Sequence, residues 1–505
     1  MKRLLVFTYV FCLALVMVGQ PRLQKTAKYI EQARQDWGVP GLAVAIVKDG
    51  EVAFSQGFGT LKQGTDQPVN GDTQFAIASN TKAFVSSALA VLVSEGKLSW
   101  DDKVVDYLPY FKLYDAYATA ETTIRDLLCH RVGLGTFSGD VIWYKSDLSA
   151  KEVIQRIRYV PQAYSFRAGY GYSNLMFITA GEVIRAVSGQ SWGEFVSDRF
   201  LKPLSMDRTL TSTNQIHAGK NVATPHKPID ERNQPIDWVN WDNMGAAGGL
   251  ISSVNDMAQW LIMNLDQGMA NGDTILHPDQ QNILWTPHNN FVLSHASKDL
   301  IPGRHFTGYG LGWGLYDYYG RMVVTHSGGY DGMYSRVALM PDENLGIVIL
   351  TNSMSGITLP LTLKVINDYI NEDESDWSRK FLDRPGSGED PVKIRKMARV
   401  ENTQPSRPLA DYTGTFDAPM HSDITISNED GKLRLSFDKA PKLSATLRHW
   451  QNDTWEIVWD ETHAWFDFGT LKFLFDHDSK ITGLEMDVPN YDIFFHEIEV
   501  TKRED

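Results

Sequence analysis

The chain has little cysteine: only Cys12 and Cys129 occur among its 505 residues. Cys12 lies in an N-terminal segment that we expect to be removed, so the mature chain would keep one thiol and could form no intrachain disulfide. A nucleophilic Cys129 assisted by the adjacent His130 is one alternative. Because neighbouring residues on a helix point in different directions, we expect Cys129 to be a buried apolar residue instead.

Basic residues are also in deficit, with 48 Lys and Arg against 62 Asp and Glu and a net charge of -14. No basic stretch offsets this acidic field, which excludes a nucleic-acid-binding protein. We expect no cofactor and no metal ion, and the expected partner is a small-molecule or peptide substrate. The 43% of hydrophobic residues can bury one large core and a second small one.

A long apolar run stands at the N-terminus, where Lys2 and Arg3 precede the stretch from Leu4 to Val18 and the small residue Gly19 offers a cleavage point. This is the form of a secretory signal peptide over residues 1–19. The run is short for a spanning helix, so we expect no stable membrane partner. The sequence predicts export to the periplasm or the medium, with an uncleaved membrane anchor as the alternative.

Three short motifs follow one another along the chain: Ser79-Asn80-Thr81-Lys82, Tyr172-Ser173-Asn174 and His326-Ser327-Gly328. A serine and a lysine three residues apart face the same side of a helix, where the amine can draw the proton from the hydroxyl. Apolar residues at helical spacing place Ser79 at the start of a helix. The free N–H groups there favour an oxyanion, and burial would push Lys82 toward its neutral form.

Each motif has extra copies, so local context must select among them. The extra copies are S-x-x-K at residues 94–97 and 436–439, Y-x-N at 369–371 and H-x-G at 217–219. In the same order, these copies lie at a helix C-cap, in a strand pattern, on an exposed helix face and in a loop, so none of them is expected to be catalytic. His326 instead follows a β-branched strand pattern, and Tyr172 lies in a Gly-rich turn. The alternatives for these two are a packed strand residue and a structural tyrosine.

Three longer segments lie between the short motifs and add to the resemblance that follows. They are residues 123–134 (TIRDLLCHRVGL), 247–258 (AGGLISSVNDMA) and 308–313 (GYGLGW). With them the chain resembles the serine beta-lactamase and penicillin-binding-protein superfamily over residues 25 to 370. The similarity is to its class C-like branch of beta-lactamase-related serine hydrolases (CubicO-type), which includes D-aminopeptidases and esterases. The alternatives within this resemblance are a class C-like beta-lactamase and a non-catalytic penicillin sensor or scaffold.

The resemblance implies a role for each motif residue. Ser79 would be the acylated nucleophile and Lys82 its proton acceptor. Tyr172 would pass a proton to the leaving group and later activate the deacylating water. Asn174 would hydrogen-bond the amide carbonyl of the substrate and hold Lys82 in place. The backbone N–H groups of Ser79 and Gly329 would form the oxyanion hole.

The third motif departs from the family pattern, because many penicillin-recognising enzymes carry Lys-Thr-Gly where this chain has His326-Ser327-Gly328. A histidine, with an ordinary pKa of about 6.5, is mostly neutral at pH 7 and would grip a substrate carboxylate weakly. Cleavage of a peptide amide, including one with a D-residue, or of an ester is therefore favoured over hydrolysis of beta-lactam rings. If His326 must be neutral, activity should rise through the pH range where histidine titrates.

The predicted fold class is α/β (α+β): an antiparallel sheet flanked by helices, with a helical subdomain. We assign residues 20–372 to this hydrolase domain and expect Ser79 between the sheet and the helical part, in a crevice where ligands commonly bind. Its strands are predicted at residues 42–47, 54–58, 323–327, 335–340 and 346–350.

A polar, Pro- and Gly-rich stretch over residues 373–407 is typical of a linker. Residues 408–505 then show short strands with no helix between them and a hairpin signal at Asp430-Gly431. This predicts a small antiparallel β-barrel, which resembles the lipocalin-like domain of CubicO-type hydrolases. We expect it to border the cleft or to form an interface between subunits, since its own side chains fill a small barrel. His463 and His477 are expected at its surface.

Overall fold

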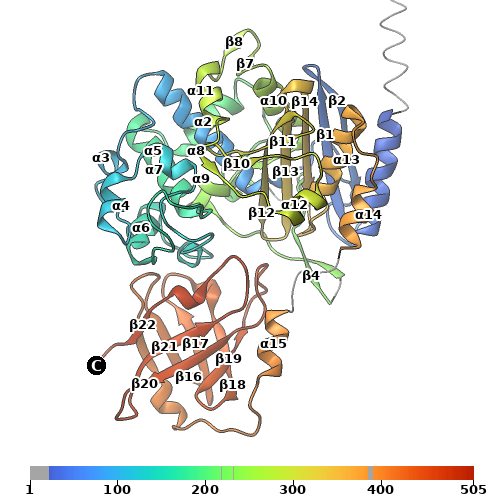
Figure 1. Cartoon of the computed structure of the whole chain (residues 1–505). Coiled ribbons are helices and arrows are strands. Elements are labelled where there is room, and N and C mark those ends of the chain that lie inside the picture. Colours follow the sequence, from blue (N-terminus) through green and yellow to red (C-terminus); the bar gives the residue numbers. More distant parts are fainter. Residues whose placement is uncertain (1–21, 218, 231, 385–389, 505) are drawn as a thin grey trace, which may run out of the picture.

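The computed structural model describes residues 22–217, 219–230, 232–384 and 390–504. It shows a large body of helices and one wide sheet, with a smaller barrel at the C-terminal end (Figure 1). The predicted signal peptide, residues 1–19, lies outside the described residues. Within the described ranges, no helix is both long enough and apolar enough to cross a bilayer.

An antiparallel sheet of eight strands organises the large body, in the order β2-β1-β14-β13-β12-β11-β10-β9. Strands from the two ends of the domain pair with each other, since β1 runs antiparallel beside β14. The sheet confirms the predicted class and contains all five predicted strands. Its strands are β1 (Gly41–Lys48), β2 (Glu51–Gly59), β9 (Asn289–Asn290), β10 (Thr307–Tyr309), β11 (Gly314–Tyr318), β12 (Arg321–Tyr330), β13 (Met333–Met340) and β14 (Leu345–Thr351).

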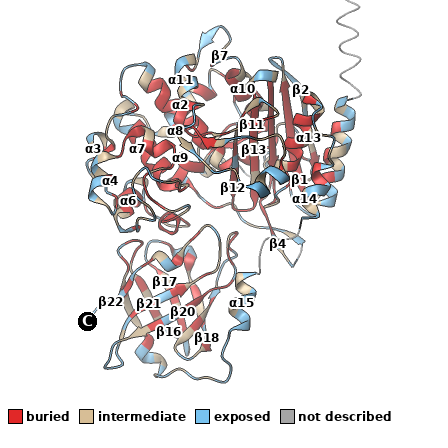
Figure 2. Ribbon diagram, in the orientation of Figure 1, coloured by how far each residue is buried: buried red, intermediate tan, exposed pale blue. Residues whose placement is uncertain are grey.

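Both faces of the sheet are covered, which explains why its central strands are apolar throughout. In β1, Val44 and Ile46 belong to the core beneath α13 (Thr358–Ile370), whereas Ala43 and Ala45 belong to the core on the opposite face. Residues 22–36 form a further helix on the α13 side of the sheet (Figure 1). Figure 2 shows the buried residues concentrated in the central strands and in the helices around them.

The chain between β2 and β9 supplies the predicted helical part. Its central helix, α2, is buried from Thr81 to Leu92 because neighbouring helices enclose it, which accounts for an apolar sequence without a clear polar face. The α-helices of this stretch are α2 (Thr81–Ser94), α3 (Val104–Tyr107), α4 (Ala116–Glu121), α5 (Ile124–Leu128), α6 (Ala150–Arg156), α7 (Asn174–Ser188), α8 (Trp192–Val196), α9 (Gly245–Gly248), α10 (Val254–Leu265) and α11 (Pro278–Leu284); α12 (His295–Leu300) lies between β9 and β10.

The C-terminal part is a closed antiparallel barrel of eight strands, as predicted. The preceding stretch carries two short helices, α14 (Trp377–Leu382), which packs against α13, and α15 (Pro391–Met397). Apolar side chains such as Leu435 and Phe473 fill the barrel core. Its strands are β15 (Gly414–Asp417), β16 (Ile424–Glu429), β17 (Lys432–Phe437), β18 (Ala445–Gln451), β19 (Thr454–Trp459), β20 (Thr470–Phe475), β21 (Ile481–Asp487) and β22 (Val500–Lys502).

The barrel docks against the helical part of the large body (Figure 1). The carboxylate of Glu497 accepts a hydrogen bond from the Gly139 N–H at 2.7 Å and another from the hydroxyl of Ser138. Arg156 Nε donates to the carbonyl oxygen of His421 at 2.9 Å. These contacts join the barrel to the end of α6 and to the turn at residues 138–139, and therefore hold the barrel against the helical part.

The prediction that His463 lies at the surface is wrong. Its side chain is only 1% exposed, and its ring stacks on Phe466 with centroids 4.6 Å apart. The ring also faces Tyr144 of the large body, so docking of the barrel removes it from solvent. A local sequence pattern cannot reveal burial that arises between domains. His477, in contrast, is exposed as expected.

Candidate active site

Ser79 lies in a short 3-10 turn, Ala78–Asn80, that leads directly into α2. Ala78 has a φ of 46°, in the left-handed region that non-glycine residues seldom adopt, so the turn before Ser79 is sharp. One helical turn further on, Lys82 Nζ donates a hydrogen bond of 3.0 Å to Ser79 Oγ. The structure thus brings the first predicted pair into direct contact.

Lys82 is completely buried and has three polar neighbours. Besides Ser79, its ammonium nitrogen donates to Asn174 Oδ1 at 2.7 Å and to the Ala247 carbonyl oxygen at 2.7 Å. Burial lowers the pKa of Lys82 to about 7, although the charge of Asp140 raises it. A substantial fraction of the amine is therefore neutral at physiological pH, which is the form that can accept a proton.

Tyr172 is the third predicted residue beside this pair, with its ring centroid 4.8 Å from Lys82 Nζ. Burial raises the pKa of Tyr172 well above its ordinary value, an effect that the neighbouring Ser79 only partly offsets. The phenol consequently keeps its proton at neutral pH and is suited to donate it.

His326 lies on β12 between two hydrogen-bond partners. Its Nδ1 is 2.6 Å from the Ser327 carbonyl oxygen, and its Nε2 is 2.8 Å from the hydroxyl of Tyr309. A carbonyl can only accept, so Nδ1 carries the ring proton and Nε2 accepts the Tyr309 proton. Burial, together with the nearby Lys82 charge, lowers the pKa of His326 to about 3. His326 is therefore neutral at pH 7, and its pKa lies well below the range in which an ordinary histidine titrates.

The next residues of β12 pass across the turn that holds Ser79. Gly328 faces this turn: a Cβ at its position would lie 2.3 Å from the Ile77 carbonyl oxygen and 2.9 Å from the Ala78 Cβ. Gly329 faces the opposite side, where an added Cβ would lie 3.3 Å from the indole of Trp465. The third motif therefore needs glycine at position 328 because strand and turn are in contact there.

A cavity of about 720 Å³ joins these residues. Lys82 lies behind Ser79, in the core of the helical part. The wall of the cavity also includes three residues of the barrel, Trp465, Asp492 and Ile493. The barrel therefore borders the cleft, which is one of the two roles expected for it. The predicted residues that line the cavity are Ser79, Tyr172, Asn174, His326, Ser327, Gly328 and Gly329.

Two residues of this site escaped sequence reasoning. Asp140 is 2% exposed and accepts hydrogen bonds from Asn174 Nδ2 at 2.6 Å and Trp143 Nε1 at 2.9 Å. The first bond orients the Asn174 amide so that its oxygen faces Lys82. Burial raises the pKa of Asp140 to about 8, against the effect of these two bonds. Tyr309, the second residue, belongs to the GYGLGW segment at residues 308–313. That segment does not by itself predict the hydrogen bond between Tyr309 and His326.

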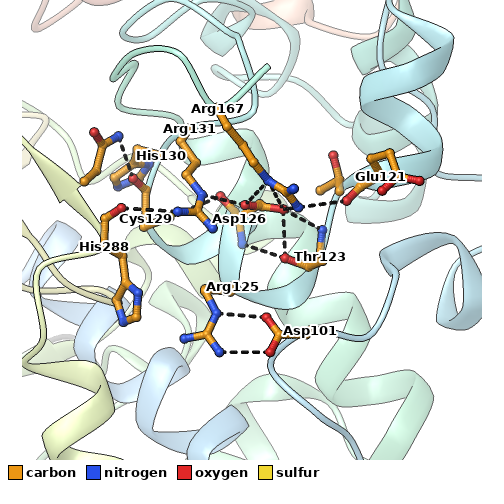
Figure 3. A network of polar contacts seen from close by, with 12 residues as sticks. Asp101, Glu121, Thr123, Arg125, Asp126, Cys129, His130, Arg131, Arg167 and His288 are labelled. Atoms are coloured by element: carbon orange, nitrogen blue, oxygen red, sulfur yellow. Dashed lines mark hydrogen bonds and ion pairs between the residues drawn. The ribbon is translucent and has the colours of Figure 1, made fainter. Parts of the chain in front are cut away.

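A buried charge network supports the loop that carries Tyr172 (Figure 3). The carboxylate of Asp126, with a side chain 0% exposed, pairs with Arg131 and Arg167 at 2.6 Å each. Burial of this carboxyl raises its pKa, but hydrogen bonds led by that from Arg167 outweigh the effect and hold the pKa below its usual range. His130, next to Arg131, accepts the Ser173 N–H at its Nδ1, so the network reaches the second motif.

Replacing Asp126 by alanine should lower the free energy of unfolding by about 3 kcal/mol, because two arginines lose a buried partner. Asp101→Ala is the matched control: Asp101 pairs with Arg125 in the same region, with a side chain 72% exposed, and its loss should cost less than about 1 kcal/mol. Chemical denaturation measures both values. Equal losses for the two variants would contradict a structural role for the Asp126 network.

The eight-stranded antiparallel sheet, the helical part, and the serine and lysine at their junction define the class of beta-lactamase/transpeptidase-like serine hydrolases. The Beta-lactamase family model matches residues 26–363, and the chain belongs to this family. A second model, described as a domain of unknown function (DUF3471), matches residues 398–502. Among the described residues, no group of three or more His, Cys, Asp or Glu side chains could hold a metal ion.

Relatives and solved structures agree with this assignment. The unguisins hydrolase of Aspergillus campestris (strain IBT 28561) is 28% identical over 450 residues, which cover 83% of this chain and 80% of that protein. The octameric penicillin-binding protein homologue from Pyrococcus abyssi has a TM-score of 0.62 at 20% identity, over 95% of this chain and 100% of the other. A D-stereospecific amidohydrolase from Streptomyces sp. has a TM-score of 0.53 at 24% identity, over 68% and 97%.

Proposed function

We propose that the protein is an exported serine hydrolase that forms an acyl-enzyme on Ser79 and cleaves a peptide amide, including one with a D-residue, or an ester. The observation that carries the proposal is the 3.0 Å hydrogen bond between Lys82 Nζ and Ser79 Oγ, in a site where burial lowers the pKa of the lysine to about 7. An amine that is neutral and in contact with a hydroxyl can act as its base.

In the acylation step, Ser79 Oγ attacks the substrate carbonyl carbon while its proton passes to Lys82. The backbone N–H groups of Ser79 and Gly329 hold the resulting oxyanion. The intermediate then collapses: the C–N or C–O bond breaks, and the leaving group takes a proton from Tyr172, which Lys82 restores. In deacylation a water attacks the carbonyl carbon of the acyl-enzyme; Tyr172 takes a proton from this water while its own proton passes to the neutral Lys82. When the bond between the acyl group and Ser79 Oγ breaks, Lys82 returns a proton to Ser79 Oγ.

The family assignment and a relative named as a hydrolase support hydrolysis as the reaction. The neutral His326 supports an amide or ester substrate over a beta-lactam, because it offers no cation to a substrate carboxylate. A D-stereospecific amidohydrolase is among the proteins of the same fold, which is the reason to include D-residue amides in the test.

The test compares kcat/KM for three substrates: D-alanine p-nitroanilide, a short-chain nitrophenyl ester and nitrocefin. We expect the anilide or the ester to be the best substrate, and Ser79→Ala to abolish its hydrolysis. Nitrocefin turnover that exceeds both by orders of magnitude would make the protein a beta-lactamase. Hydrolysis that persists in Ser79→Ala, or no hydrolysis of any of the three, would overturn the proposed reaction.

The pH dependence should report Lys82 and not His326. Since Lys82 must be neutral to accept a proton, kcat/KM should rise with pH up to about 7, the pKa of the lysine, and then level off. His326→Gln should lower the rate but leave this limb in place, because the histidine pKa of about 3 lies below the measured range. A limb that shifts or flattens in His326→Gln would show that the histidine itself titrates there.

A further inference from the structure

His130 is a fully buried histidine that takes no part in the proposed proton transfers. Its ring packs among three aromatic rings, with centroid distances of 4.3 Å to Tyr172, 4.8 Å to Tyr309 and 5.4 Å to Phe177. The backbone of His130 has a φ of 61°, in the left-handed region that residues other than glycine seldom adopt. Such a conformation persists only where the surrounding contacts impose it, and it is frequent at functional sites.

His130 hydrogen-bonds to the chain on both sides of Tyr172. Its carbonyl oxygen accepts the N–H of Gly171 at 3.0 Å, and its Nδ1 accepts the N–H of Ser173 at 3.0 Å. One residue thus holds the neighbours that come immediately before and after Tyr172, and its ring also packs on the Tyr172 ring with an angle of 36° between the planes. Two backbone bonds and one ring contact therefore set where the Tyr172 phenol lies.

These contacts require one protonation state of the His130 ring. Since Nδ1 accepts a hydrogen bond, the proton of the neutral ring is on Nε2, which has no hydrogen-bond partner within the described ranges. A second proton, on Nδ1, would point at the N–H of Ser173, so that two donors would face each other. Burial, with Lys82 and His326 nearby, lowers the pKa of His130 well below its ordinary value. At neutral pH the ring is therefore an acceptor, and it acts through its contacts.

We propose that His130 is a positioning residue, which holds the Tyr172 phenol at the place from which it can protonate the leaving group. This rests on the proposed function, in which the leaving group takes its proton from Tyr172. The proton matters most for an amide, because the nitrogen must be protonated as the C–N bond breaks, whereas p-nitrophenolate leaves as a stable anion. Loss of His130 should therefore impair the cleavage of an anilide far more than that of a p-nitrophenyl ester.

The test uses the full-length protein and two substrates with the same acyl group, alanine p-nitroanilide and alanine p-nitrophenyl ester, in both stereoisomers. The quantity measured is kcat/KM, which reports the acylation step. His130→Phe keeps an aromatic ring but loses the Nδ1 acceptor. It should lower the anilide value by about 100-fold, the usual cost of misplacing a reacting group by roughly 1 Å, and the ester value by less than about threefold. Tyr172→Phe should show the same selective loss.

Three further variants complete the experiment, each checked by thermal unfolding. His130→Asn should keep the anilide value within about tenfold of wild type, because its Oδ1 can accept the Ser173 N–H and asparagine tolerates a positive φ. His130→Gly fits a φ of 61° without strain and should lose anilide activity selectively even where the phenylalanine variant does not fold. His288→Phe is the matched control (Figure 3): the His288 ring contacts the Ile283 carbonyl oxygen of α11 at 2.9 Å, and its loss should keep the anilide-to-ester ratio within about twofold.

Several outcomes would overturn the proposal. Equal losses on the anilide and the ester in the folded His130 variants, beside a selective loss in Tyr172→Phe, would reduce His130 to a residue of the fold and leave the proposed function standing. A wild-type ratio in His130→Phe or His130→Gly, or a fall in His130→Asn as large as theirs, would also contradict positioning through the Ser173 bond. No selective loss in Tyr172→Phe, or no hydrolysis that depends on Ser79, would overturn the proposed reaction and this inference with it.

Discussion

Lys82→Met should lower kcat/KM on the best substrate by about 10³- to 10⁴-fold, the usual contribution of a positioned general base. Methionine has a similar length and fills the buried space around α2, so the fold should persist. The lost hydrogen bonds to Asn174 and Ala247 would cost some stability, about 1–3 kcal/mol for each acceptor left unpaired. Thermal unfolding separates this effect from the loss of activity.

The chain offers its own control for Lys82. Ser94 and Lys97 repeat the S-x-x-K pattern at the end of α2, where Lys97 pairs with Glu95 at the surface. Lys97→Met should keep kcat/KM within about twofold, since surface changes away from a site have small effects. Activity within tenfold of wild type in Lys82→Met, or an equal loss in Lys97→Met, would contradict the role proposed for Lys82.

Gly328→Ala should lower kcat by at least about 100-fold, the cost of displacing reacting groups by roughly 1 Å. The added methyl would meet the Ile77 carbonyl oxygen at 2.3 Å, so β12 must move away from the turn that carries Ser79. This movement would separate the N–H of Gly329 from that of Ser79 and thereby open the proposed oxyanion hole. Overpacking of this kind also lowers the free energy of unfolding by about 1–3 kcal/mol.

Gly356→Ala is the matched control, because Gly356 lines the same cavity and an added Cβ there would lie 3.8 Å from its nearest neighbour, Trp37. It should reduce kcat by no more than about twofold. The account of the third motif would fail if Gly328→Ala kept wild-type kcat while folding normally. The measurement is steady-state kinetics on both variants, with circular dichroism to verify folding.

Much of the fold could be predicted from the sequence, because strands and helices are indicated by patterns of neighbouring residues. The apolar run of β1 and the β-branched approach to His326 predicted strands that the structure contains, and the alternation after residue 408 predicted the barrel. The spacing of Ser79 and Lys82 likewise fixes their contact, since three residues make nearly one helical turn.

What the sequence could not reveal depends on contacts between distant segments. Asp140 stands in no motif, and only the fold brings it to Asn174, 34 residues away. His463 and Asp492 are ordinary polar residues of a barrel until docking buries one and places the other at the cavity. The low pKa of His326 has the same origin, because burial beside Lys82 causes it.

The most direct test of the central claim is to locate the covalent adduct. The full-length protein is incubated with a fluorophosphonate and with a fluorescent penicillin, and the modified peptide is identified by mass spectrometry. A single adduct on Ser79 that is absent from Ser79→Ala is the predicted result. Labelling that survives in Ser79→Ala, or an adduct on another serine such as Ser94, would contradict an acyl-enzyme at Ser79.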